Sequence, residues 1–237
     1  MTSRRGEILA EMGLAPIWKL RTSPTAAAPA AQAGTPPPVA EPALGEAREA
    51  QIGAMDWAGL KAAVAVCTAC GLHKTRTQTV FGVGDERAEW MLVGEAPGAE
   101  EDRLGEPFVG QAGKLLDNML AALDLQRGRN VYIANVLKCR PPDNRNPEPG
   151  ELAQCAPFLL RQIELLRPRL IVAMGRFAAQ TLLDSDASIA SLRGRVYRFH
   201  GVPLIVTYHP AYLLRNLPDK AKAWADLLFA RRTLSGL

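Results

Sequence analysis

The segment from Gly94 to Asp102 is the part of the sequence best suited to chemistry. It follows the apolar run Trp90–Val93, which predicts a buried strand, and it turns through a Gly-x-x-Pro-Gly pattern. Three consecutive carboxylates end the segment. Sheets of the α/β class place their binding sites in the crevice at the carboxyl ends of the strands. The pattern therefore predicts an active-site loop.

Two other polar residues directly follow apolar runs. Asn135 comes after residues 131–134, and His209 comes after residues 204–208 and before a proline. Asn135 either closes a turn or reads a ligand edge that presents both C=O and N–H, because an amide donates and accepts. His209 is either a structural histidine or a donor into the same crevice. Phe108, in a turn-rich loop, either anchors that loop or offers a stacking surface.

The four cysteines predict a metal or cluster site. Cys67 and Cys70 form a CxxC pair, whereas Cys139 and Cys155 lie far downstream and loosely spaced. Four thiolates suit a structural zinc ion or a [4Fe–4S] cluster, and the loose second pair favours the cluster over a zinc ribbon. A thioredoxin-like CxxC fits poorly, because it would open a helix and this pair closes one. Four unrelated buried thiols are a further interpretation.

Regular elements must position these residues. Strands are predicted by the apolar runs Trp90–Val93, Val131–Ala134, Leu170–Met174 and Leu204–Thr207, with an extra strand at Arg195–Phe199. Helical spacing predicts helices over Ala112–Leu123, Glu151–Leu166, Arg176–Leu183 and Asp219–Leu234. This alternation predicts an α/β fold with a mainly parallel sheet covered by helices.

The chain divides into three predicted parts. Residues 1–20 predict a short amphipathic helix, and residues 21–55, rich in Ala and Pro, predict a disordered linker. The folded domain covers residues 56–237, where Asp56 is a good N-cap. The N-terminal helix is either a dispensable tail or a peptide that docks on a protein partner.

Composition restricts the class of protein. A hydrophobic content of 48% predicts a globular core, and no apolar run approaches the length of a membrane span. The net charge of +4 favours an anionic partner only weakly, and all of it lies in 56–237, because 1–55 carry equal numbers of acidic and basic residues. The N-terminus lacks the apolar core of a signal peptide. We therefore expect a cytoplasmic protein whose cysteines are not paired as disulfides.

Residues 138–147 form a basic, Pro-rich loop. Such a loop suits a phosphate backbone, or it is simply solvated. The nearby segment Gly110–Lys114 looks like part of a phosphate-binding P-loop. Phe108 stands where the motif needs an earlier Gly, however, and Leu115 stands where it needs Ser or Thr. A P-loop is therefore excluded.

Together these pieces resemble the family 4 uracil-DNA glycosylases, the iron–sulfur branch of the uracil-DNA glycosylase superfamily. The resemblance covers roughly residues 56–237. Its markers are Cys67-x-x-Cys70, Gly94-Glu95-Ala96-Pro97-Gly98 with Glu101-Asp102, Pro107-Phe108-Val109-Gly110, Asn135-Val136-Leu137-Lys138-Cys139, Cys155 and His209-Pro210-Ala211.

The resemblance implies a three-layer αβα sandwich around a four-stranded, mainly parallel sheet. It implies a monofunctional hydrolase of base excision repair that flips uracil out of DNA, cuts its N-glycosidic bond and leaves an abasic site. It also implies that Cys67, Cys70, Cys139 and Cys155 hold a structural [4Fe–4S] cluster. The expected partner is uracil-containing DNA, double- or single-stranded, bound by a monomer.

The resemblance also assigns the residues that bind the base. Phe108 would lie against the flipped ring. Asn135 would accept from uracil N3–H and donate to O4, a pattern that cytosine reverses. His209 would donate to O2, where negative charge builds as the bond breaks. Glu95 would shape the pocket, and backbone N–H groups near Ala96 would meet a pyrimidine carbonyl.

The attacking water is assigned to a carboxylate. Ala96 stands where another branch of the superfamily carries an activating Asp, so that chemistry is excluded at this position. Glu101 matches the acidic position that holds the water or guards the C5 edge of the ring, with Asp102 as its substitute.

DNA contacts are expected from two segments. After His209, three side chains are candidates to fill the gap left by the flipped base, and basic side chains would hold phosphates. These are Tyr212, Leu213 and Leu214 for the gap and Arg215, Lys138 and Arg140 for the phosphates. The region 191–195 lacks the His-containing insertion of a related branch that traps DNA covalently, so we expect turnover.

Two other functions fit parts of the pattern. A non-enzymatic Fe–S module that binds nucleic acid is disfavoured, because Phe108, Asn135, Glu101 and His209 are all present. A zinc-stabilised α/β hydrolase lacks the multi-ligand metal chemistry that such a reaction usually needs.

Overall fold

The structure is a computed structural model, and it describes residues 44–236. The predicted N-terminal helix and the greater part of the predicted linker lie outside the described residues. In the described part, no helix is long and apolar enough to cross a membrane.

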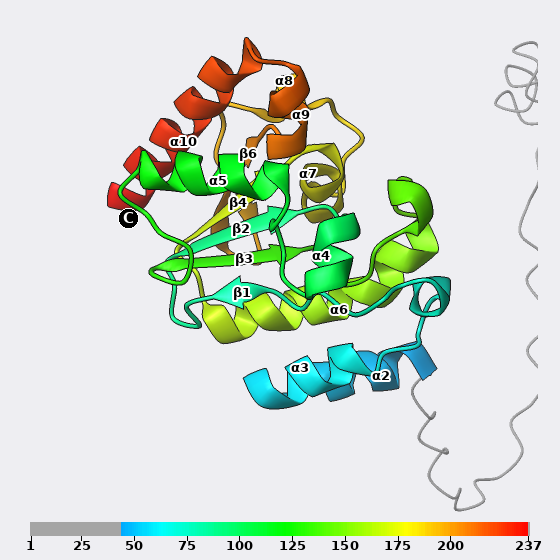
Figure 1. Cartoon of the computed structure of the whole chain (residues 1–237). Coiled ribbons are helices and arrows are strands. Elements are labelled where there is room, and N and C mark those ends of the chain that lie inside the picture. Colours follow the sequence, from blue (N-terminus) through cyan, green and yellow to red (C-terminus); the bar gives the residue numbers. More distant parts are fainter. Residues whose placement is uncertain (1–43, 237) are drawn as a thin grey trace, which may run out of the picture. The chain divides into compact units, whose positions relative to one another are not determined.

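A six-stranded sheet forms the centre of the fold (Figure 1). Its order is β1-β3-β2-β4-β6-β5, and the four central strands run parallel. The strands are β1 (Val83–Gly84), β2 (Trp90–Gly94), β3 (Val131–Asn135), β4 (Leu170–Met174), β5 (Tyr197–Phe199) and β6 (Val202–Thr207).

The four predicted strands are the four parallel ones, and the α/β class is confirmed. The strand number was too low, because short antiparallel strands pair on both edges. Of these, β5 falls within the predicted extra strand, whereas β1 has too few residues to show a pattern. Two-residue strands depend on a neighbour for their pairing, so only the tertiary structure reveals them.

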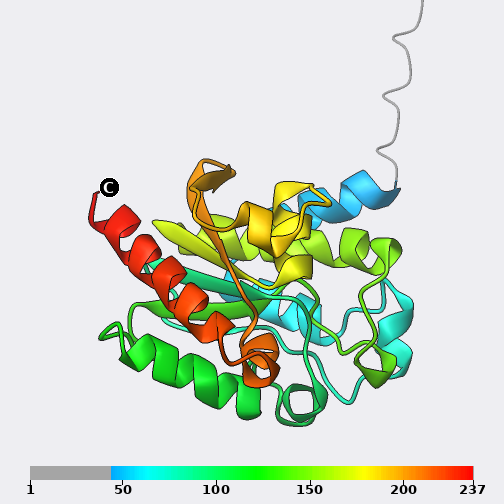
Figure 2. The same ribbon diagram turned by 90° about the horizontal axis from the view of Figure 1, so that it is seen from above.

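Helices cover both faces of the sheet, as Figures 1 and 2 show. One face packs on α5 (Gln111–Ala121) and α10 (Asp219–Ser235). The other packs on α6 (Pro149–Leu166), α7 (Arg176–Leu183) and α8 (Ile189–Leu192). The central strands are therefore buried on both sides, which explains why they read as continuous apolar runs.

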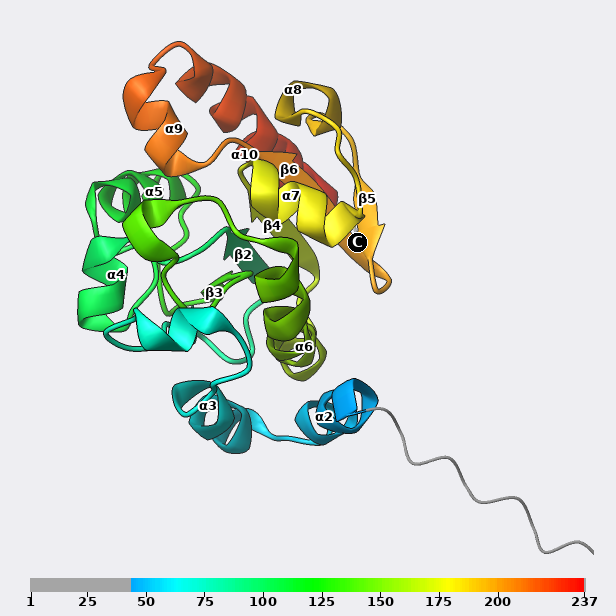
Figure 3. The same cartoon turned by 90° about the vertical axis from the view of Figure 1, so that its right-hand side faces the viewer.

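A third apolar cluster lies outside these layers. Helices α2 (Leu44–Gly53) and α3 (Trp57–Ala65) pack against α6 through Ile52, Leu60 and Phe158 (Figure 3). Asp56 caps α3, as predicted, and accepts from Gly59 N–H at 2.8 Å. The predicted linker boundary at residue 55 needs correction, because α2 already belongs to the folded domain.

Short helices occupy segments that the sequence suggested were loops. They are α4 (Ala99–Leu104) and α9 (Pro210–Arg215), with a 3-10 turn at η2 (Pro142–Asn144) in the basic loop. Another 3-10 turn, η1 (Gly71–Lys74), follows the CxxC pair. Figure 3 shows α4, α7 and α9 around the ends of the central strands. Helices of six residues are too short for a hydrophobic period to show in the sequence.

Candidate active site

The carboxyl ends of the central strands open into a cavity of about 750 Å³. Gly94 of β2 pairs with Asn135 of β3, and Met174 of β4 pairs with Thr207 of β6, so these ends are level. The predicted site residues that line the cavity are Glu95, Ala96, Glu101, Phe108, Asn135, His209, Tyr212 and Arg215. The location at strand ends agrees with the expected active-site crevice.

Asn135 is buried, with only 2% of its surface exposed. Its Oδ1 atom is a buried acceptor without a hydrogen-bond partner among the described residues. Such an orphan acceptor costs free energy, so it points to a ligand that donates an N–H group. Gly94 allows this arrangement: a Cβ at residue 94 would overlap Oδ1 and lie 2.7 Å from Phe108 Cζ.

His209 stands at the start of α9 with its ring in the cavity wall. Its Nδ1 accepts from Ala211 N–H at 3.1 Å, which leaves the proton on Nε2. Burial lowers the pKa of His209 to about 4, although the charge of Glu101 opposes this shift. The ring is therefore a neutral Nε2–H donor at pH 7.

Phe108 has the left-handed backbone angle φ 56°, which is uncommon for a bulky residue. The Arg127 guanidinium donates to the carbonyl of Pro107 at 2.7 Å and to that of Phe108 at 2.8 Å, which holds this conformation. The Phe108 ring stacks on His209, with centroids 5.3 Å apart and an interplanar angle of 29°. Phe108 thus packs in the core and also lines the cavity.

The Glu101 carboxylate accepts hydrogen bonds from the backbone of two loops. Its Oε1 accepts from Val109 N–H at 3.0 Å and Gly110 N–H at 3.1 Å, and its Oε2 accepts from Gly98 N–H at 3.1 Å. Because it lines the cavity as well, Glu101 joins the first active-site loop to the loop that carries Phe108.

Asp102 does not face the cavity, so its prediction as a substitute for Glu101 is wrong. It is 4% exposed, and both carboxylate oxygens accept from Thr77 N–H at 3.0 Å. On a helix, adjacent residues point about 100° apart, and here α4 turns Glu101 inward and Asp102 toward Thr77.

Glu95 lines the cavity with the most strongly perturbed carboxylate of the site. Burial raises its pKa to about 7, and the charge of Arg176 only partly opposes this. Among the described residues, no protein group donates a hydrogen bond to its carboxylate. A carboxylate that titrates near pH 7 in a cavity is suited to general base chemistry.

Two of the predicted DNA contacts are wrong because their side chains are buried. Lys138 and Leu213 each expose only 1% of their surface. By contrast, Leu214 is 42% exposed, and Arg215 is exposed as well. Leu213 faces the core because α9 turns one side of the predicted loop inward.

Two other predicted DNA contacts, Tyr212 and Arg140, already make hydrogen bonds within the protein. Tyr212 stacks on Tyr208, with centroids 5.1 Å apart, and its hydroxyl donates to Asp219 at 2.7 Å. Arg140 donates from Nε to Asn144 Oδ1 at 2.9 Å. Both side chains are half-buried.

Sequence reasoning missed Arg176, an exposed cation on the cavity wall. It follows β4 after a single glycine, Gly175, whose φ of 89° favours glycine. The same strand-end argument that identified Asn135 and His209 also applies to β4 and would have found it.

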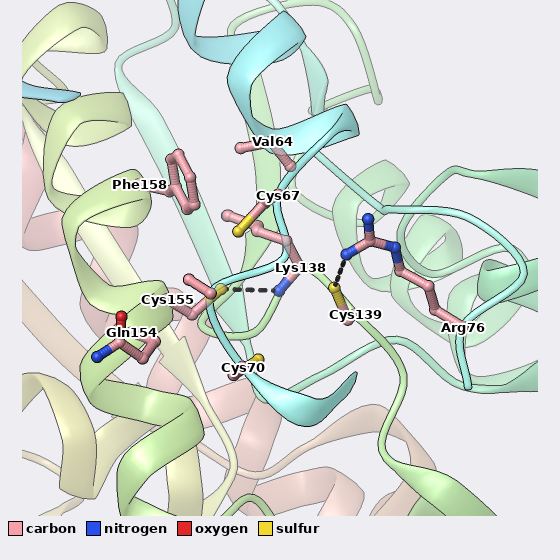
Figure 4. Close-up of a pocket in the computed structure, with 10 residues that line it drawn as sticks. Val64, Cys67, Cys70, Arg76, Lys138, Cys139, Gln154, Cys155 and Phe158 are labelled. Carbon is pink, nitrogen blue, oxygen red and sulfur yellow. Dashed lines mark hydrogen bonds between the residues drawn. The ribbon is translucent and has the colours of Figure 1, made fainter. Parts of the chain in front are cut away.

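A second, smaller cavity brings all four cysteines together (Figure 4). Cys67 and Cys70 come from the segment after α3, Cys139 from the segment after β3, and Cys155 from α6. None of them is paired in a disulfide. Between residues 44 and 236, no three His, Cys, Asp or Glu side chains form a group arranged to hold a metal ion.

The surroundings of the sulfurs suit a metal centre held by thiolates. Arg76 donates to Cys139 Sγ at 3.1 Å, and the Lys138 backbone N–H donates to Cys155 Sγ at 3.2 Å. Hydrogen bonds of this kind accompany cysteine-bound iron–sulfur clusters. Burial raises the pKa of the Cys155 thiol to about 12, so a cationic centre is needed to hold it as a thiolate.

Comparison with known proteins identifies the family. The family model of the uracil DNA glycosylase superfamily matches residues 81–228. The type-4 uracil-DNA glycosylase of Archaeoglobus fulgidus is 53% identical over 156 residues, which are 62% of this chain and 78% of that protein. The Thermotoga maritima type-4 enzyme is 48% identical over 158 residues, 66% of this chain and 82% of that protein.

A third relative extends the match further. The type-4 uracil-DNA glycosylase of Pyrobaculum aerophilum is 44% identical over 181 residues, which are 73% of this chain and 92% of that protein. The α/β fold, the binding cavity at the strand ends and these matches all indicate the same family. The chain therefore belongs to the type-4 uracil-DNA glycosylases of the uracil DNA glycosylase superfamily.

Proposed function

We propose that this glycosylase flips uracil out of double- or single-stranded DNA into the 750 Å³ cavity and hydrolyses its N-glycosidic bond. The products are free uracil and an abasic site. The observation that carries the proposal is the orphan Oδ1 of Asn135. Uracil N3–H would satisfy this acceptor, and the amide N–H would donate to O4. Cytosine presents an acceptor at N3, so it would leave two acceptors face to face.

His209 supplies the electrostatic part of the proposed mechanism. Its Nε2–H would donate to uracil O2, where negative charge develops as the bond to the sugar breaks. A neutral donor that is already held by Ala211 needs no reorganisation during the reaction. The Phe108 ring, fixed by Arg127, would lie against the flipped base.

For the attacking water we propose Glu95 in place of Glu101, which the sequence favoured, and of Asp102, its substitute. Glu95 is the carboxylate of the cavity with a pKa near 7 and with free oxygens among the described residues. Glu101 would act mainly by holding the two loops together and by placing negative charge near His209.

A monofunctional reaction agrees with the residues that line the cavity. Bifunctional glycosylases need an amine nucleophile that forms a Schiff base. No lysine is among the described residues of the cavity wall, and Lys138 is buried behind Asn135. Water is therefore the nucleophile that we propose.

We also propose that the four cysteines hold a [4Fe–4S] cluster. When bound, the cluster would supply a covalent crosslink between the segment after α3, the segment after β3, and α6. Two observations support the cluster: all four cysteines line one cavity, and Cys139 and Cys155 lack the tight spacing of a zinc ribbon.

Two experiments test these proposals. The purified protein is incubated with a uracil-containing oligonucleotide, and the product is split with alkali at abasic sites. Cleavage only after alkali is expected, and cleavage without alkali would refute the monofunctional assignment. Protein purified without oxygen should show broad visible absorbance and about four irons per chain. Colourless protein with one zinc per chain would refute the cluster.

A further inference from the structure

Lys138 lies between the two sites of the molecule. It follows Asn135 by three residues and directly precedes Cys139. It is 1% exposed and does not line the base-binding cavity, so it meets neither substrate nor solvent. Burying an ammonium group is costly unless it is fully hydrogen-bonded, so this position calls for an explanation.

The side chain is held by a buried polar network. Its Nζ donates to the main-chain oxygen of Asn135 at 2.8 Å and to Gln162 Oε1 at 2.6 Å. Gln162 in turn donates from Nε2 to Phe81 O at 2.9 Å and to the Tyr132 hydroxyl at 3.2 Å. The network therefore joins α6 to the end of β3.

The main chain of Lys138 is also hydrogen-bonded on both sides. Its N–H donates to Cys155 Sγ at 3.2 Å, and its carbonyl accepts from Val80 N–H at 2.8 Å. Figure 4 shows Lys138 among the residues around the cysteines. Residue 138 is thus fixed on both sides, and its side chain reaches back to the residue that reads the base.

The carbonyl of Asn135 needs this contact. The next two N–H groups continue the pairing with β2, from Val136 to Gly94 O at 2.9 Å and from Leu137 to Glu95 O at 3.0 Å. The β3 ladder ends at this point, and the chain turns toward the cysteines. The peptide unit after Asn135 is therefore held at both ends, by the Val136 N–H bond to Gly94 and by the Nζ contact to its carbonyl, and this fixes the main chain from which the Asn135 amide extends.

We propose that Lys138 is a positioning residue for uracil recognition, which holds the Asn135 main chain so that its amide faces the base. This inference rests on the proposed function of Asn135. It assigns Lys138 a role in base reading, not in phosphate binding. The alternative is that Lys138 only stabilises the fold or the cysteine cavity.

The test compares Lys138→Met with Lys61→Met, which makes the same change at an exposed lysine of α3. Binding is measured to two oligonucleotides. One carries a non-cleavable 2′-fluoroarabino uracil nucleotide, and the other carries an abasic-site analogue that offers Asn135 nothing to read. Iron content is measured on the same samples.

We expect Lys138→Met to weaken binding of the uracil oligonucleotide about tenfold or more, as for loss of a charge-assisted hydrogen bond. Binding of the abasic oligonucleotide and the iron content should stay within about twofold of the parent protein. Equal weakening of both ligands, or loss of iron together with uracil binding, would overturn the proposal in favour of a structural role. Unchanged binding of both ligands would overturn it as well.

A second variant keeps the test decisive if the first does not fold. Lys138→Gln keeps an amide donor in the buried network and leaves the contacts of Gln162 with Phe81 and Tyr132 in place, but it removes the charge and shortens the reach toward Asn135 O. The same selective loss is expected. The parent protein separates the two hypotheses: failure of the parent to release uracil would refute the proposed function. Cleavage by the parent with intact uracil binding by the variants would refute only the role of Lys138.

Discussion

Replacing Asn135 by Ala should damage activity without damaging stability. In most buried positions this change removes satisfied hydrogen bonds and lowers the free energy of unfolding. Here Oδ1 is unpaired in the protein without substrate, so its desolvation already counts against the folded state. The site thus holds a destabilising atom that is useful only when a base is bound.

The expected magnitudes follow from this geometry. Two hydrogen bonds to the base are lost, which together are worth about 3–4 kcal/mol, or about 10²–10³ in kcat/KM. Removing the orphan acceptor should return about 1–3 kcal/mol of unfolding free energy, whereas the lost packing of the amide costs about 1 kcal/mol. The net change is zero to about 2 kcal/mol in favour of the folded protein. For a domain of this size that means a Tm unchanged or raised by up to about 6 °C.

Asn216→Ala is the matched control. Its Nδ2 donates to Tyr212 O at 3.1 Å, so this hydrogen bond is lost and the Tm should fall by about 2–4 °C. Thermal melts at one scan rate and cleavage of a uracil oligonucleotide are measured on both variants. A fall in the Tm of Asn135→Ala as large as that of the control would refute the reasoning about the orphan acceptor. Retained cleavage would refute its role in reading the base.

Three further changes test the remaining walls of the site. Gly94→Ala should lower cleavage about 100-fold, because a Cβ at this position would overlap the Asn135 amide that reads the base. Its control, Gly110→Ala, should keep cleavage near the parent level, because that Cβ would meet its nearest atom at 3.6 Å. Equal effects of the two changes would contradict the close-packing argument. In the parent protein kcat/KM should rise with pH around 7, since Glu95 is ionised only above its pKa, whereas His209, with a pKa of about 4, stays neutral throughout. Glu95→Gln should abolish that rise. A pH profile of the variant that keeps the rise would assign the titration to another group. Leu214→Ala should leave the Tm unchanged, because the side chain is 42% exposed. It should reduce cleavage of duplex DNA more than cleavage of single-stranded DNA, because only the duplex has a gap to fill when the base flips out. An equal reduction for both substrates would argue against Leu214 as the side chain that fills this gap.

The sequence was sufficient for the central sheet. Parallel strands covered on both faces must be apolar throughout, so Trp90–Val93 and Leu170–Met174 stand out as runs between polar turns. Polar residues that end such runs are brought to one edge by the parallel topology. For this reason Asn135 and His209 could be placed in one crevice before the structure was known.

The sequence was not sufficient where direction matters within a short helix. Glu101 and Asp102 are adjacent acidic residues, and Leu213 and Leu214 are identical in type, yet one member of each pair is engaged in the interior of the fold. A helix of six residues is too short to reveal its phase from the sequence. The packing of α4 and α9 against the rest of the domain sets that phase.

Lys138 shows most clearly the difference between what the sequence determines and what only the tertiary structure decides. By itself the sequence determined that a lysine lies in a basic, Pro-rich loop beside a cysteine, and this context favoured contact with phosphate. Only the tertiary structure decided that α6 covers it and supplies Gln162 as a partner. Burial of a long cationic side chain depends on acceptors from distant segments, and the spacing of residues within one segment carries no information about them.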